Sequence, residues 1–131
     1  RVLFRSAKLT NKKQVDVWGN GKALREFTYS QDIAKIILFL LKNYDGEEPI
    51  NIGNTEEYSI KEIVEIICNF LEYDGVINWQ TNLPTGQLRK PTSNKKLLEL
   101  GWKQENYTPL NYGIKKTCEW FKMNYPNIRG F

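Results

Sequence analysis

Residues 17–32, VWGNGKALREFTYSQD, constrain the fold of this chain more than any other stretch. They predict a strand that ends in a glycine-rich turn at Gly19 and Gly21, followed by Arg25 and then a helix. Glycine permits both the backbone angles of such a turn and the close approach of a ligand to the backbone. The stretch therefore predicts an α/β fold with a ligand beside the turn.

Hydrophobic periodicity along the rest of the chain supports this fold class. Helices are expected where apolar residues recur at helical spacing, and short strands where they alternate or cluster between turn signals. Ser30 and Ser59 are expected to cap two of the helices, the second through a Ser-x-x-Glu capping box, and Thr108 to cap the last. The expected helices cover 30–44, 60–72, 93–100 and 108–121, and the expected strands 15–17, 26–29, 49–53 and 76–80.

The glycine pattern argues against a complete dinucleotide-binding unit. Gly19-x-Gly21 is only a fragment of the Gly-x-Gly-x-x-Gly signature, and no other expected strand precedes such a turn. A chain of 131 residues fits one domain. It has no apolar run long enough to cross a membrane and no visible signal peptide, so we expect a cytoplasmic protein.

Charge and cysteine content narrow the possible chemistry. The net charge of +4 is interspersed along the chain, which favours a mildly basic surface over a nucleic-acid footprint and leaves a basic pocket for a small anion open. The chain has no histidine, and Cys68 and Cys118 lack Cys-x-x-Cys spacing. We therefore expect no metal site and no Ser–His–Asp or Cys–His pair, and we expect both cysteines to be buried thiols.

The first six residues, RVLFRS, resemble one reading frame of a widely used sequencing adapter. Residues 1–6 are therefore expected to be non-native, with the natural sequence occupying 7–131. Resequencing the locus with a different library chemistry tests this expectation, and recovery of RVLFRS would contradict it.

Four motifs carry a family resemblance, which extends from about Ala7 to the end of the chain. In order, VWGNGKALREFTYSQDIA, PINIGNTEEYSIKEI, LPTGQLRKPTSNKKLLELGW and CEWF resemble the carboxyl-terminal half of the GDP-L-fucose synthase family, part of the NAD-dependent epimerase/dehydratase family. The resemblance implies that residues 7–131 form a small helix-rich C-terminal substrate domain of an extended short-chain dehydrogenase/reductase, without its Rossmann domain. Leu3, inside the adapter-like segment, stands where the family has a basic substrate contact.

The resemblance implies four substrate-binding residues. Trp18 matches a tryptophan that lines the GDP-sugar pocket, and Arg25 matches a substrate-binding arginine whose planar fork suits a diphosphate. Lys90 matches a basic position near the nucleotide sugar, and Arg89 is able to share that role. Thr85 stands where the family usually has an aspartate, which removes a charge from that contact.

The residues themselves leave other interpretations of these side chains open. Trp18 could cover the core of the domain at the end of its strand. Arg25 could form a surface ion pair with Glu26 or Asp32, and Lys90 could be a solvated loop charge.

The family resemblance implies the reaction as well. It converts GDP-4-keto-6-deoxy-D-mannose to GDP-L-fucose by 3,5-epimerisation and NADPH-dependent 4-reduction. The family's catalytic residues lie upstream of the matched segment, so no catalytic residue is expected here and the fragment is expected to be inactive alone. NADP would be bound mainly by the missing N-terminal Rossmann half, which is the expected partner besides a GDP-sugar. The full-length enzyme is expected to be a homodimer.

Two other functions remain open from the sequence. One is another nucleotide-sugar epimerase or dehydratase of the same superfamily. The other is a non-enzymatic basic binding module, which the sequence pI of about 9.0 and the 13% aromatic content would suit.

Overall fold

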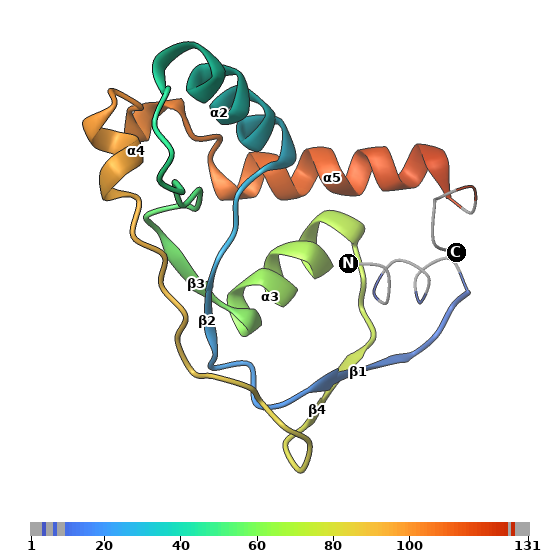
Figure 1. Ribbon diagram of the computed structural model, residues 1–131. Helices are drawn as coiled ribbons and strands as arrows, with labels where there is room; N and C mark the ends of the chain where they lie inside the picture. The colour runs from blue at the N-terminus through green and yellow to red at the C-terminus, as the bar shows by residue number, and fades with distance from the viewer. Residues whose placement is uncertain (1–3, 5–6, 8–9, 126, 128–131) are drawn as a thin grey trace.

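The computed structural model describes Phe4, Ala7, residues 10–125 and Asn127, and it has the expected α/β class (Figure 1). Leu3 and the other expected non-native residues except Phe4 lie outside this description. Among the described residues, no helix has the length and hydropathy needed to cross a membrane. The strands are β1 (Gln14–Trp18), β2 (Leu24–Glu26), β3 (Glu57–Ser59) and β4 (Val76–Gln80), and the helices are α2 (Ser30–Asn43), α3 (Ile60–Leu71), α4 (Lys95–Glu99), the 3-10 helix Gln104–Asn106 and α5 (Leu110–Asn124).

The strands form two separate two-stranded sheets. β1 and β4 are parallel, with Val17 opposite Trp79, and β2 and β3 are antiparallel, with Arg25 opposite Tyr58. A parallel pair needs a long crossover connection, and here it contains β2, α2, β3 and α3 (Figure 1). The strand expected at 26–29 begins two residues earlier, at Leu24, and ends at Glu26. Residues 27–29 lead into α2 instead.

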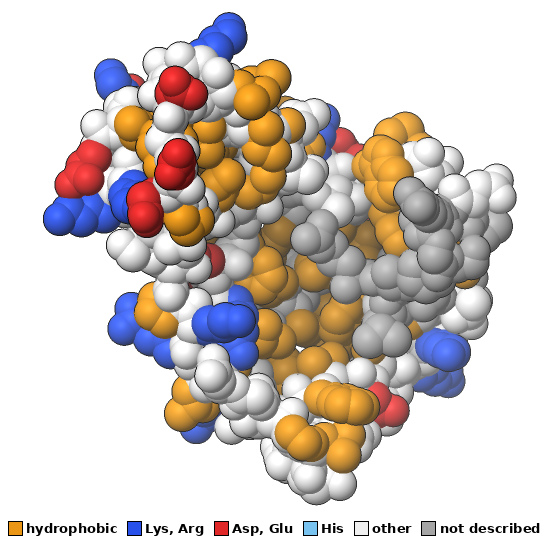
Figure 2. All heavy atoms as spheres, viewed as in Figure 1, with side chains coloured by type: hydrophobic (Ala, Val, Ile, Leu, Met, Phe, Trp, Pro, Cys, Tyr) orange, Lys and Arg blue, Asp and Glu red, His pale blue; other side chains and the backbone are white. Residues whose placement is uncertain are grey.

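Two hydrophobic clusters hold these elements together. The first joins β1, α3 and α5 through Val15, Ile67 and Ile114, and the second joins α2 to the segment around α4. Phe39 and Trp102 meet edge to face in the second cluster, with ring centroids 5.4 Å apart. Figure 2 shows that hydrophobic side chains also remain at the surface, over α2 and in the hollowed centre of this view.

The two cysteines differ in burial. Cys118 is buried in the first cluster, as expected, whereas Cys68 is half-buried. Burial, together with the charge of Glu65, raises the pKa of the Cys68 thiol. A raised pKa disfavours the nucleophilic thiolate, so Cys68 is a structural thiol.

The capping box at the start of α3 is confirmed, whereas the cap expected at Ser30 is wrong. The Ser59 hydroxyl accepts from the Glu62 amide at 3.1 Å, and the Glu62 carboxylate accepts from the Ser59 amide at 2.7 Å. The Ser59 hydroxyl also donates to the Glu62 carboxylate at 2.7 Å, and this bond, together with the one from the Ser59 amide, holds the pKa of Glu62 below its usual value. Ser30 lies inside α2, because the Tyr29 carbonyl already accepts the first helical bonds and Tyr29 is the N-cap.

This difference gives a paired prediction. Ser59→Ala should lower the free energy of unfolding by about 1 kcal/mol, because the first turn of α3 loses its side-chain acceptor. Ser30→Ala should leave stability unchanged within about 0.5 kcal/mol, since no side-chain cap bond is lost there. Urea denaturation of the two variants measures both values, and equal losses would contradict this description of the helix starts.

The strand expected at 49–53 is absent from the described structure, because no neighbouring strand pairs with it. Ile50 and Ile52 nevertheless pack against the second cluster. The following turn is held by side chains, since Asn94 Nδ2 and the Tyr107 hydroxyl both donate to the Gly53 carbonyl, at 2.8 and 2.7 Å. The segment is therefore anchored at one end without belonging to a sheet.

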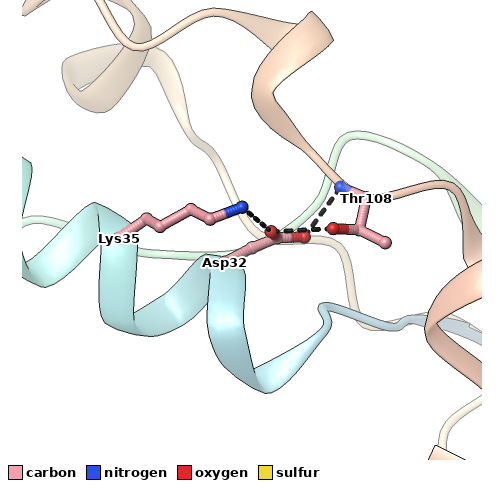
Figure 3. Close-up of polar contacts among 3 residues, drawn as sticks. All are labelled: Asp32, Lys35 and Thr108. Atoms are coloured by element: carbon pink, nitrogen blue, oxygen red, sulfur yellow. Dashed lines mark hydrogen bonds and ion pairs between the residues drawn. The ribbon is translucent and has the colours of Figure 1, made fainter. Parts of the chain in front are cut away.

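Asp32, in the first turn of α2, connects this helix to the segment that precedes α5 (Figure 3). The residue is completely buried, and its carboxylate accepts from the Thr108 amide at 2.7 Å and from the Thr108 hydroxyl at 2.9 Å. Exposed Lys35 contacts the same carboxylate at 3.4 Å. Because its hydroxyl is engaged with Asp32, Thr108 does not cap α5, whose N-cap is Pro109. Asp32 thus fixes α2 against the segment that leads into α5.

Candidate functional site

The loop between β4 and α4 runs alongside β2 (Figure 1). The Leu24 amide donates to the Leu88 carbonyl at 2.8 Å, which extends the edge of β2. Arg25 Nη2 donates to the Gln87 carbonyl at 2.8 Å. These bonds bring the motif containing Lys90 next to the motif containing Arg25, although more than sixty residues separate them.

Arg25 carries a charge that no described carboxylate neutralises. Its guanidinium donates to two backbone carbonyls, those of Leu24 at 2.5 Å and Gln87 at 2.8 Å. The alternative ion pairs with Glu26 and Asp32 are not formed, since both carboxylates bond backbone amides elsewhere. A guanidinium has five N–H donors, so half-buried Arg25 retains donors for an anionic ligand.

Trp18 and Thr85 both lie next to the glycine turn. Gly19 has φ +81°, and a Cβ placed on it would lie 2.7 Å from Thr85 Cγ2, so the loop packs directly on the turn. Trp18 is 69% exposed, which contradicts the alternative that it covers the core. The Thr85 hydroxyl reaches only its neighbour's carbonyl, Gly86 O, at 3.5 Å. Both side chains therefore face solvent beside the turn.

Two carboxylates anchor the loop on either side of Lys90. Glu26 and Glu57 lie opposite each other in the β2–β3 ladder, an arrangement of like charges that needs compensation. Arg89 Nε donates to Glu57 at 2.6 Å, and the Thr92 amide donates to Glu26 at 2.5 Å. The ion pair raises the pKa of Arg89 and commits its charge to Glu57. Lys90 lies between the anchors, exposed and without an ion pair to any described residue.

The anchor at Glu57 can be tested by proteolysis. Glu57→Gln should make trypsin cleave the Arg89–Lys90 bond about fivefold faster, because a loop that loses its anchor opens more often. Glu65→Gln, which changes an exposed carboxylate of α3, is the matched control and should leave the rate unchanged. Equal cleavage of the two variants would show that the ion pair does not hold the loop.

The sequence did not identify Glu26 or Glu57 as part of the site. Each acts through a contact more than thirty residues away in the chain, which no local pattern encodes. The nearest available signal was an acidic residue following Arg25 in a short strand. Both are positioning residues, because they fix the loop rather than face a ligand.

A separate cavity of about 430 Å³ lies between the start of α2, α3 and α5. Ile63, Ile67 and Ile114 form part of its wall, and the hollowed centre of Figure 2 is correspondingly rich in hydrophobic side chains. Lys116, the one cation among its described lining residues, is paired with Glu119 at 3.1 Å. An anionic ligand therefore fits the surface formed by Arg25 and the loop between β4 and α4 better than it fits this cavity. Figure 2 also shows Lys and Arg side chains on the side where β2 and the loop run.

Comparison with known proteins places these features in a wider context. Residues 2–53 match the model of the NAD dependent epimerase/dehydratase family. The chain is 36% identical over 121 residues to the probable GDP-L-fucose synthase 1 of Oryza sativa subsp. japonica, covering 92% of this chain and 36% of the rice protein. It is 37% identical over 113 residues to the GDP-L-colitose synthase of Yersinia pseudotuberculosis, covering 86% of this chain and 36% of that protein.

A solved structure shows the same similarity in three dimensions. The GDP-L-fucose synthetase of Naegleria fowleri bound to NADP superimposes with a TM-score of 0.88 at 36% identity, over 95% of this chain and 39% of that protein. The chain therefore spans little more than a third of the proteins it matches.

Proposed function

Because this chain belongs to the NAD-dependent epimerase/dehydratase family, we propose that it forms the nucleotide-sugar-binding part of a GDP-L-fucose synthase. The observation that carries the proposal is the Arg25 guanidinium, which is fixed on two carbonyls and has no carboxylate partner among the described residues. A fixed planar cation of this kind suits the diphosphate of a GDP-sugar.

In this proposal, each of the four expected site residues makes a different contact with the ligand. Arg25 donates to the diphosphate, and Lys90 adds a point charge on the anchored loop. Exposed Trp18 offers its indole face to the base or the sugar. Thr85 supplies an uncharged hydroxyl where the family usually has an aspartate, which weakens that single contact.

The glycine turn within the described residues does not fit the role of an NADP cradle. The turn at Gly19 and Gly21 leads into β2, whereas a dinucleotide site uses such a turn to open a helix whose N-terminus faces the phosphates. NADP, which the Naegleria structure contains, is therefore assigned to the part of the full-length enzyme outside this match. This chain contributes charge complementarity and orientation of the sugar to 3,5-epimerisation and 4-reduction, and no catalytic residue.

An activity measurement tests whether this chain needs the rest of the enzyme to supply the cofactor site and the catalytic residues. The chain alone should not oxidise NADPH in the presence of GDP-4-keto-6-deoxy-D-mannose. The same chain fused to the unmatched part of the rice relative should do so, because the fusion restores the cofactor half. Oxidation of NADPH by the chain alone would contradict the assignment.

Another GDP-sugar product is the second candidate, favoured by the 37% identity to a GDP-L-colitose synthase. The product released by the fusion distinguishes the two, since GDP-L-fucose and GDP-L-colitose differ in their sugars. A homodimer of the complete enzyme also remains part of the proposal, and the mass of the fusion in solution tests it.

A further inference from the structure

The turn between β1 and β2 contains the one Asn-Gly pair of this sequence, Asn20-Gly21. Gly21 has φ +75°, and a Cβ placed on it would lie 2.8 Å from the Trp79 ring, so the turn requires glycine here. Asn20 is exposed, and its Oδ1 accepts from the Lys22 amide at 3.0 Å. The turn thus holds an exposed carboxamide against the backbone that follows it.

The groups needed to close a ring between these two residues are both available. Within the described residues, the Gly21 amide donates no hydrogen bond and the Asn20 Nδ2 group has no partner. Attack of the Gly21 nitrogen on Asn20 Cγ forms a five-membered ring, and glycine puts no side chain in the way. The Lys22 amide is placed to stabilise the negative charge that develops on Oδ1 during this attack.

We propose that Asn20 is a site of spontaneous covalent modification, in which its carboxamide is hydrolysed. The Gly21 nitrogen gives its proton to a base of the solvent and forms a bond to Asn20 Cγ. The bond from Cγ to Nδ2 then breaks, and ammonia leaves with a proton from the solvent. Water opens the resulting cyclic imide at one of its two carbonyls, which leaves aspartate or isoaspartate. The reaction consumes only water and needs no oxidant or reductant.

Either product places a carboxylate in the turn next to Trp18. In isoaspartate the backbone runs through Cβ and Cγ, so it is also longer by one atom. The Gly19 amide donates to the Gln80 carbonyl at 3.0 Å. The Lys61 amide donates to the Gly21 carbonyl at 2.9 Å, so both ends of the turn are fixed and a longer backbone distorts it. The new charge repels a diphosphate. The resulting loss of GDP-sugar affinity rests on the proposed function, whereas the modification itself does not.

Incubation of the chain at mildly alkaline pH, followed by trypsin and mass spectrometry, tests the modification. The tryptic peptide 14–22 should gain about 1 Da and separate into two products. Asn82, which is exposed and precedes Leu83, is the matched control within the chain. Asn20 should react roughly tenfold faster or more, because the Leu83 side chain crowds its nitrogen. The Leu83 amide is also bound to the Gln80 carbonyl, at 3.0 Å. Equal rates at the two asparagines would overturn the proposal.

A synthetic peptide of residues 14–22 shows whether folding permits the reaction. The peptide and the folded chain should both be modified at Asn20. A chain that stays unmodified while the peptide reacts would show that the turn protects Asn20, and this result would equally overturn the proposal.

Asn20→Ser provides the matched variant, since its hydroxyl is able to accept from the Lys22 amide but offers no carboxamide. This chain fused to the unmatched part of the rice relative is incubated in both forms and titrated with GDP-L-fucose. The wild type should lose about tenfold in affinity as it is modified, and Asn20→Ser should lose none. A fusion that is modified but never binds GDP-L-fucose would contradict the proposed function and support the modification. A fusion that binds GDP-L-fucose and stays unmodified would do the reverse.

Discussion

Asp32→Ala should lower the free energy of unfolding by about 2–4 kcal/mol, a larger loss than we expect from any cap or surface substitution in this chain. The substitution removes a fully buried carboxylate that accepts two hydrogen bonds from Thr108. It leaves the Thr108 amide and hydroxyl, both in partly buried hydrogen bonds, without their acceptor. Urea denaturation followed by circular dichroism measures the loss.

Lys35 provides the control for this substitution. Its ammonium contacts the same carboxylate at 3.4 Å, but the side chain is 59% exposed. Lys35→Met should therefore change the free energy of unfolding by less than about 0.5 kcal/mol. A loss as large as that of Asp32→Ala would mean that the ion pair, rather than the bonds to Thr108, holds α2 in place.

Arg25→Ala should weaken the binding of a GDP-sugar by about 1.5–3 kcal/mol, which is roughly 10- to 150-fold in affinity. Under the proposed function the variant loses a charge-assisted bond to the diphosphate, while NADP binding should remain the same because the cofactor is assigned to the part of the enzyme outside this match. Isothermal titration of the fusion with GDP-L-fucose and with NADP measures both. An unchanged dissociation constant for GDP-L-fucose would count against the assignment of Arg25.

Arg25 also holds the loop through the Gln87 carbonyl, so the variant needs a second measurement. The rate of tryptic cleavage at Arg89–Lys90 reports the loop independently of the ligand. A loss of affinity with normal cleavage is the expected result for a ligand-binding role. Lys95→Ala, at an exposed lysine of α4 paired with Glu99, is the control for a nonspecific loss of positive charge.

Local sequence patterns correctly predicted the helices and strands that depend on interactions between neighbouring residues. The α/β class, α3 with its capping box, and strands β1 and β4 follow from side chains a few residues apart. The resemblance to GDP-L-fucose synthases is confirmed by the comparisons, because long motifs in a fixed order are specific.

Most of the expectations that failed depend on a distant residue, whereas the cap of α2 was misplaced by one residue for a local reason. Ser30 was expected to cap α2, and residues 49–53 to be a buried strand, but helix bonds to Tyr29 and the lack of a neighbouring strand decide otherwise. Thr108 and Asp32 each have an ordinary local explanation, yet they bond each other across 76 residues. The contacts by which Glu26 and Glu57 anchor the loop also join residues far apart in the sequence, so no local pattern predicted them.

The central claim is that Arg25 and the loop between β4 and α4 bind a nucleotide sugar. The indole N–H signals of the four tryptophans in this chain test it most directly. In a titration of the chain with GDP-L-fucose followed by NMR, the signal of exposed Trp18, assigned with Trp18→Phe, should shift, and that of buried Trp102 should not. A chain whose Trp18 signal ignores GDP-L-fucose but shifts with RNA or DNA at moderate salt would be a basic binding module instead, and the account would be wrong.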